Sequence, residues 1–131
     1  MQNTTDNQTI LVVDDDAPLL TALVDKLTRE GYRVFSAPNA KEGLDRAVKH
    51  KVDLILLDIM MPEMDGVSMM KEVRKKGTWG KKVPVIFLTN LDPNDSEIKK
   101  VKGGETDFFL VKVNWTMNSL LEKIRECLKY T

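Results

Sequence analysis

Short apolar runs alternate along this chain with longer segments in which apolar residues recur every three or four positions. The runs have the length of buried strands, and they cover residues 10–13, 32–37, 54–57, 83–88 and 108–111. The segments between and after them have helical period, around residues 20–27, 40–48, 65–73, 95–102 and 117–128. This alternation predicts five strand–helix units in succession.

Residues that favour helix ends support the first two of these units. Pro18 suits a first helical turn with an acidic residue ahead of it as cap, and Gly31 suits the end of that helix. Asn39 followed by Glu42 resembles a capping box at the start of the second helix. Pro84 stands at the start of its strand, where a missing N–H is tolerated.

Five such units indicate an α/β fold with a parallel, doubly wound sheet, because each crossover must pass over one face of the sheet. The strand runs are apolar on both faces, as expected when helices cover both. We expect one domain over residues 9–131 and a disordered polar tail over residues 1–8. In such sheets ligands bind beyond the carboxyl ends of the strands, so function is sought there.

Four of the predicted strands end in residues that carry chemistry. The first ends in Asp14-Asp15-Asp16, the third in Asp58, the fourth in Thr89 and the fifth in Lys112. Taken singly, each has an ordinary explanation as a helix cap, a turn residue, a β-former or a solvated charge. Together they predict a functional site, because clustered carboxylates repel one another unless a cation is bound. Oxygen ligands favour Mg²⁺ or Ca²⁺ over zinc.

Composition narrows the class of protein. Twenty basic and twenty acidic side chains among 131 residues give a formal net charge of zero, which disfavours a nucleic-acid or anionic-membrane binder. The single cysteine allows no internal disulfide, and one histidine with one cysteine allows no structural zinc site. No apolar run is long enough to cross a bilayer, and no signal peptide is visible. We therefore expect a soluble, cytoplasmic domain.

At these strand ends the chain resembles the receiver domain of two-component response regulators, over about residues 10–129. The motifs that carry the resemblance are LVVDDD at 11–16, LDIMMPEMDG at 57–66, PVIFLT at 84–89 and DFFLVK at 107–112. The second motif is highly specific. The resemblance implies a flavodoxin-like (βα)5 fold whose five-stranded parallel sheet has the strand order 2-1-3-4-5.

The resemblance also implies a phosphorylation site that depends on a metal. Asp58 aligns with the aspartate that takes a phosphoryl group from the phosphohistidine of a sensor histidine kinase or phosphotransfer protein. Asp15 and Asp58 align with direct Mg²⁺ ligands, Asp14 with an acid that acts through a metal-bound water, and the backbone carbonyl of Met60 with the remaining protein ligand. Such a module is a signalling phosphoacceptor that assists its own phosphoryl transfer, not an enzyme.

Three further positions align with residues that sense the phosphoryl group. Lys112 aligns with the lysine that pairs with its oxygens, and Thr89 with the hydroxyl that hydrogen-bonds one of them. Thr89 and Phe109 occupy the family's switch positions, through which the surface of the fourth helix, fifth strand and last helix changes state. That surface would control a partner or effector, and could support a phosphorylation-dependent dimer.

The sequence departs from the family pattern near this output surface. Val113 stands where the family usually has a cis-proline after its lysine, and Asn90 stands where it has a small residue after its threonine. Residues 105–106 replace the usual Gly-Ala before the fifth strand, and residues 77–80 indicate a lengthened loop before the fourth. We expect a trans bond before Val113. Met60 lies two positions after Asp58, and Leu91 lies two positions after Thr89. Both side chains are bulky and cannot orient an attacking water by hydrogen bonding, so we expect slow self-dephosphorylation.

Three alternatives remain open at this point. A flavin mononucleotide binder would need a Ser/Thr/Gly-rich loop after the first strand to hold the phosphate. Residues 14–16 are three aspartates instead, which disfavours this alternative. An aspartate-nucleophile phosphatase would match Asp14 and Asp16 but leaves the motif at 57–66 unexplained. A degenerate receiver, not phosphorylated and acting as a protein-binding module, is compatible with Asn90 and Val113.

Overall fold

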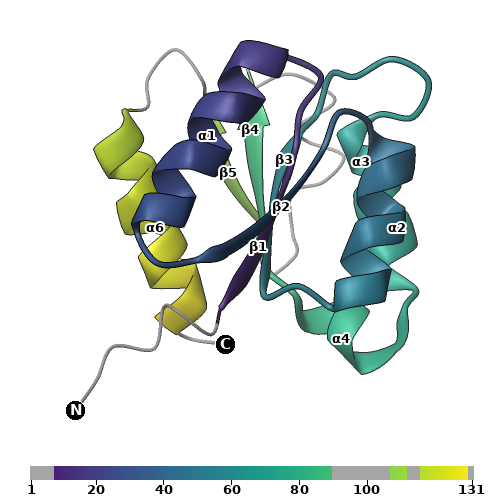
Figure 1. Cartoon of the computed structure of the whole chain (residues 1–131). Helices are drawn as coiled ribbons and strands as arrows, with labels where there is room; N and C mark the ends of the chain where they lie inside the picture. Colours follow the sequence, from purple (N-terminus) through teal and green to yellow (C-terminus); the bar gives the residue numbers. More distant parts are fainter. Residues whose placement is uncertain (1–7, 90–106, 112–115, 130–131) are drawn as a thin grey trace.

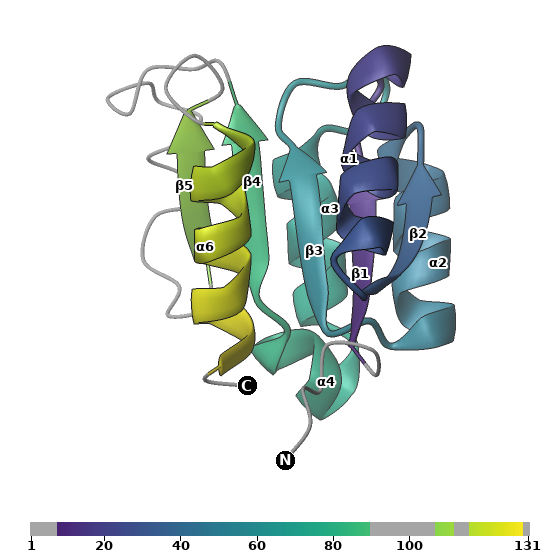
Figure 2. The ribbon, with the colours of Figure 1, turned by 60° about the vertical axis from the view of Figure 1, so that its left-hand side comes forward.

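A five-stranded parallel sheet forms the centre of the molecule, in the order β2-β1-β3-β4-β5 (Figure 2). The computed structural model describes residues 8–89, 107–111 and 116–129, and the side chains of residues 89, 107–111 and 129 lie outside this description. The strands are β1 (Thr9–Val13), β2 (Arg33–Ala37), β3 (Leu54–Asp58), β4 (Val85–Thr89) and β5 (Asp107–Val111). The parallel sheet and its predicted strand order are confirmed.

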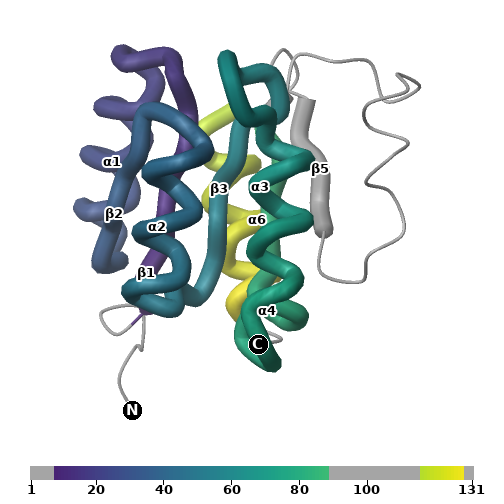
Figure 3. The backbone as a smooth tube through the Cα atoms, turned by 90° about the vertical axis from the view of Figure 1, so that its right-hand side faces the viewer, coloured from purple at the N-terminus to yellow at the C-terminus, as the bar shows by residue number. Residues whose placement is uncertain are grey.

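Helices cover both faces of this sheet (Figure 1). They are α1 (Ala17–Arg29), α2 (Ala40–His50), α3 (Gly66–Arg74), α4 (Gly77–Lys82) and α6 (Met117–Lys129). α1 and α6 lie on one face, and α2 and α3 lie side by side on the other (Figure 3). α4 lies at the end of the sheet opposite the strand arrowheads (Figure 2). The helix predicted around 95–102 lies outside the described residues.

The alternation of side chains along each central strand divides the core into two layers. Leu11, Ile55 and Phe87 face α2 and α3, whereas Ile10, Leu56 and Ile86 face α1 and α6. All six are fully buried, because helices on both faces exclude water from β1, β3 and β4. This confirms that the apolar runs are strands buried on both sides. Because the strands are parallel, their carboxyl ends lie at the same edge of the sheet.

Short polar side chains begin three of the helices. Asp16, Asn39 and Asp65 each accept a hydrogen bond from the backbone N–H three residues later, at 3.1, 2.9 and 2.7 Å. The expected acidic cap before Pro18 is thus Asp16, and the expected pair of Asn39 and Glu42 is present, with the Asn39 amide also donating to Glu42. Helix α1 ends before Gly31, whose φ of 100° suits glycine.

Residues 77–82 form the short helix α4 where the sequence predicted only a longer loop. Two glycines disfavour helix there, so tertiary contacts hold it. The Arg74 guanidinium donates to the carbonyls of Gly80 and Val83 at 2.9 and 2.6 Å. The Trp79 indole N–H donates to the Val52 carbonyl at 2.8 Å, 27 residues away along the chain. The segment is therefore an ordered helix, and it packs at the end of the α2–α3 layer that lies opposite the carboxyl ends of the strands (Figure 2).

Strand β2 is an edge of the sheet, and its outer side is partly covered. β2 pairs with β1 alone, and its residues are mostly half-buried. The Arg46 guanidinium, from α2, donates a hydrogen bond to the Ser36 carbonyl of β2. The same guanidinium contacts Glu42 at 3.2 Å, so it is held from both sides. Among the described residues, no helix is long and apolar enough to span a membrane.

Candidate functional site

Three carboxylates meet at the carboxyl edge of the sheet. Asp58 is the last residue of β3, and Asp14 and Asp15 directly follow β1. β1 and β3 are neighbours, with Val13 opposite Leu57 in the register. One oxygen from each of Asp14, Asp15 and Asp58 lies within 4.8 Å of the others. The prediction that the first and third strands bring their acids together is confirmed.

The three acids differ in their exposure to solvent. Asp14 is 1% exposed and Asp58 6% exposed, whereas Asp15 is open to water. The Asp16 backbone N–H donates to Asp14 Oδ1 at 2.9 Å, which orients the buried carboxylate. The Asp16 side chain itself turns away to cap α1. The triple aspartate therefore divides into two residues of the acidic cluster and one helix cap, in line with the cap expected ahead of Pro18.

The loop after β3 is tightly closed behind Asp58. The Gly66 N–H donates to the Ile59 carbonyl at 3.0 Å. A Cβ added at Gly66 would stand 2.2 Å from the Asp58 carbonyl oxygen, so no side chain fits there. Gly66 belongs to the motif at 57–66, but sequence reasoning did not identify its role. The close backbone approach fixes where the Asp58 backbone lies.

The donor set suits a hard divalent cation. All three clustered side chains are carboxylates, and Mg²⁺ and Ca²⁺ take oxygen ligands. Carboxylate oxygens this close repel one another, and two of the acids have little water around them. A bound cation would offset that repulsion. Met60, which follows in the loop, is 60% exposed and faces solvent.

The other predicted site residues are placed only in part. Thr89 ends β4, and its backbone pairs with Val111 of β5, one residue before Lys112. Phe109 lies in β5 opposite Phe87. The side chains of Thr89 and Phe109, and all of Lys112, lie outside the description. The strand ends nevertheless bring positions 58, 89 and 111 to the same edge of the sheet. Asn90, Leu91, 105–106 and Val113 also lie outside the described residues.

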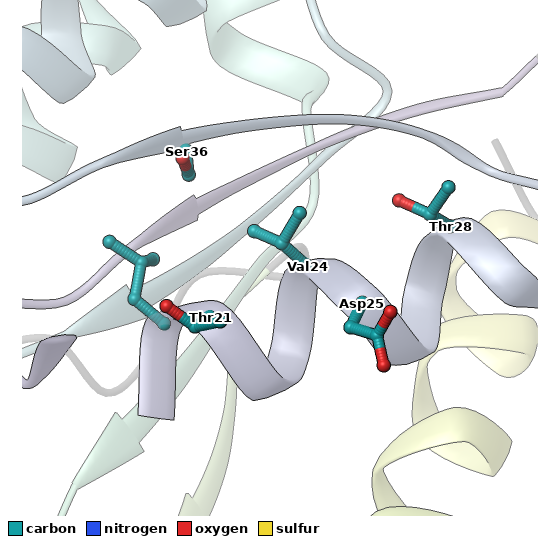
Figure 4. Close-up of a pocket in the computed structure, with 6 residues that line it drawn as sticks. Thr21, Val24, Asp25, Thr28 and Ser36 are labelled. Atoms are coloured by element: carbon teal, nitrogen blue, oxygen red, sulfur yellow. The ribbon is translucent and has the colours of Figure 1, made fainter. Parts of the chain in front are cut away.

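A hollow lies between α1 and β2 (Figure 4). It is lined by Leu20, Thr21, Val24, Asp25 and Thr28 of the helix and by Ser36 of the strand. Its described lining holds one carboxylate among hydroxyl and aliphatic groups, so these residues provide no set of converging charges. None of its lining residues belongs to the acidic cluster.

Comparison with known proteins agrees with this geometry. The family model of the response regulator receiver domain matches residues 10–125. The alkaline phosphatase synthesis transcriptional regulatory protein PhoP of Bacillus subtilis is 39% identical over 99 residues, which are 76% of this chain. Those residues span 39% of the relative's length, so the similarity covers a part of that protein.

Solved structures show the same fold. The chemotaxis protein CheY4 of Vibrio cholerae superposes with a TM-score of 0.81 at 30% identity, covering 92% of this chain and 98% of that one. The receiver domain of a sensor histidine kinase from Pseudomonas aeruginosa PAO1, with a magnesium ion coordinated in its active-site cleft, gives 0.81 at 27% identity, covering 93% and 98%.

The family match runs from the first strand into the last helix, and it includes all three clustered acids. Neither a flavin site nor a phosphatase site is needed to explain the motif at 57–66. The chain belongs to the receiver domains of two-component response regulators.

Proposed function

We propose that this receiver is phosphorylated on Asp58, in a reaction that depends on Mg²⁺. The observation that carries the proposal is the meeting of Asp58 with Asp14 and Asp15, with oxygens within 4.8 Å, at the edge of the sheet where such folds bind ligands. Asp58 is the acid that ends a fully buried strand, and the close approach of Gly66 fixes its backbone.

The metal would be held by residues that differ in burial. Asp15 and Asp58 would be the direct carboxylate ligands, Asp14 would act through a water, and the backbone carbonyl of Met60 would complete the protein ligands. When bound, Mg²⁺ supplies positive charge that offsets the acids and the phosphoryl oxygens. The Asp16 N–H already orients the buried Asp14 carboxylate. This agrees with an indirect role for Asp14 at the metal.

The chain's own residues carry out the transfer. A carboxylate oxygen of Asp58 attacks the phosphorus of a phosphohistidine on a sensor histidine kinase or phosphotransfer protein, the P–N bond breaks, and the imidazole leaves. The product is an acyl phosphate on Asp58. Lys112 pairs with the phosphoryl oxygens, and Thr89 donates a hydrogen bond to one of them. The Gly66 contact holds the Asp58 backbone in place during the attack.

The phosphoryl group is then sensed through Thr89 and Phe109. Movement of Thr89 toward the phosphate and of Phe109 into the vacated space biases the surface formed by 95–102, β5 and α6 between two states. That surface controls a partner or effector, and it supports a phosphorylation-dependent dimer. Met60 lacks a strong hydrogen-bond acceptor to orient water, so we expect the acyl phosphate to hydrolyse slowly. A lifetime of only seconds would contradict this.

The test is incubation with Mg²⁺ and a small acyl phosphate donor, followed by intact-mass measurement. We expect a gain of one phosphoryl group, lost in Asp58→Asn and retained in Asp45→Asn, a matched change of an exposed aspartate on α2. Removal of Mg²⁺ with a chelator should also abolish the gain. An unmodified mass in the folded wild-type chain would favour the degenerate receiver that acts only as a binding module.

A further inference from the structure

Met60 differs from the other methionines in its exposure to solvent. The residue is 60% exposed, and it is the only large hydrophobic residue of the described part that is exposed. The remaining described methionines are buried or half-buried, namely Met61, Met64, Met69, Met70 and Met117. Water-borne reagents therefore reach one thioether of the described chain far more readily than the others.

The loop directs Met60 toward solvent. Its neighbours Ile59 and Met61 are 1% and 8% exposed, so both are anchored in the core and Met60 between them is directed outward. The hydrogen bond from the Gly66 N–H to the Ile59 carbonyl closes the same loop. Since consecutive Cα atoms are about 3.8 Å apart, the Met60 Cα lies within about 7.6 Å of the Asp58 Cα.

The thiol that would compete for an oxidant is protected. Cys127 is the one cysteine, it is 5% exposed, and burial raises the pKa of its thiol to about 11. The thiolate is the reactive form of cysteine, so little of it is present near neutral pH, and its side chain is also shielded from solvent. Among the sulfurs of the described residues, the thioether of Met60 is thus the one that a peroxide reaches first.

We propose that Met60 is a reversible oxidation site for peroxides, and that its sulfoxide shortens the lifetime of the phosphoryl group on Asp58. In the reaction the sulfur takes one oxygen atom from the peroxide and loses two electrons. The O–O bond breaks, and the peroxide leaves as water or an alcohol. The oxidation itself follows from exposure alone, whereas the effect on lifetime rests on the proposed function of Asp58.

The effect follows from the change in polarity. A thioether is a weak hydrogen-bond acceptor, whereas a sulfoxide oxygen is a strong one. Two residues from Asp58, such an oxygen can hold a water close to the acyl phosphate, where reduced Met60 does not. One added hydrogen bond to the attacking water accelerates hydrolysis about two- to tenfold.

The first experiment tests the oxidation without any phosphorylation. The folded wild-type protein is treated with dilute hydrogen peroxide, and peptide mapping follows the gain of one oxygen at each methionine. We expect Met60 to be oxidised several-fold faster than Met61, Met69 and Met70, with Cys127 unmodified. In urea-unfolded protein the methionines should react at similar rates. Equal rates in the folded protein would overturn the proposal.

The second experiment measures the decay of the phosphoryl group, with and without peroxide, in wild type and in Met60→Leu. We expect peroxide to shorten the lifetime in wild type, to have no effect in Met60→Leu, and to be reversed by a methionine sulfoxide reductase. An unchanged lifetime in fully oxidised wild type would overturn the inference alone. Failure of reduced wild type to accept phosphate would instead overturn the proposed function, and the first experiment would still stand.

Discussion

Replacing Gly66 by alanine should disable phosphorylation by moving Asp58. The added Cβ would lie 2.2 Å from the Asp58 carbonyl oxygen and 3.1 Å from the Ile59 Cα. Cβ atoms essentially never approach another heavy atom within 3.0 Å, so the start of α3 and the end of β3 must separate by about 0.8 Å. The contact is with backbone, which cannot rotate aside as a long side chain would.

This displacement should affect stability and chemistry separately. Forcing a methyl group into a closed backbone contact costs about 1–3 kcal/mol of unfolding free energy. A misplacement of about 1 Å at a reacting group can lower the rate about a hundredfold. We therefore expect Gly66→Ala to be destabilised moderately and phosphorylated far more slowly than wild type, under conditions where both are folded.

Gly80 offers a matched control at the other end of the molecule. A Cβ at Gly80 would lie 2.0 Å from the Val73 carbonyl oxygen, so Gly80→Ala introduces the same kind of backbone clash away from the site. Urea unfolding should show similar losses of stability for the two variants, while only Gly66→Ala loses phosphorylation rate. If both variants accept phosphate at the wild-type rate, or both lose it equally, the positioning role of Gly66 is refuted.

Three further changes test contacts outside the site. Trp79→Phe replaces the indole by a smaller phenyl ring and removes the donor to the Val52 carbonyl. Urea unfolding should show a loss of stability of about 1–3 kcal/mol, and an unchanged midpoint would contradict it. Lys51 has φ of 45° at the end of α2, so Lys51→Gly should raise stability by about 0.5–1 kcal/mol, whereas a lower melting temperature would show that the backbone there is unstrained. The folded chain retains the Cys127 proton as pH rises from 9 toward 11, because burial raises the pKa of that thiol from 9.0 to about 11, while the unfolded chain releases it. Stability should therefore fall across this window more steeply in wild type than in Cys127→Ala, as measured by urea unfolding at each pH.

The features that sequence predicted well are those that depend on local pattern. Continuous apolar runs identified the strands, because residues such as Leu56 and Ile86 must be apolar on both faces of a covered sheet. The meeting of Asp14 with Asp58 followed from one rule, that parallel strands place their carboxyl ends at one edge. β4 begins at Val85, after Pro84, two residues later than predicted, since strand ends are set by pairing.

The features that sequence missed depend on contacts between distant residues. The glycines at 77 and 80 indicated a loop, but Trp79 finds the Val52 carbonyl and Arg74 holds the carbonyls around α4. The role of Gly66 depends on how closely α3 approaches the end of β3, a distance that no pattern encodes. By contrast, the resemblance already assigned Asp15 to the site and the sequence placed an acidic cap before Pro18, which the structure identifies as Asp16.

The hydrogen bond from Arg46 to the Ser36 carbonyl has a consequence for how the protein behaves in concentrated solution. The outer side of an edge strand is a template on which another chain can add a strand and begin an aggregate. A chain of zero net charge has little long-range repulsion to keep copies apart. At β2 the guanidinium occupies one of the carbonyls that such a strand would need, and it brings a positive charge to the edge. At the β2 edge, protection against pairing with another chain is thus local, because it comes from one side chain of α2.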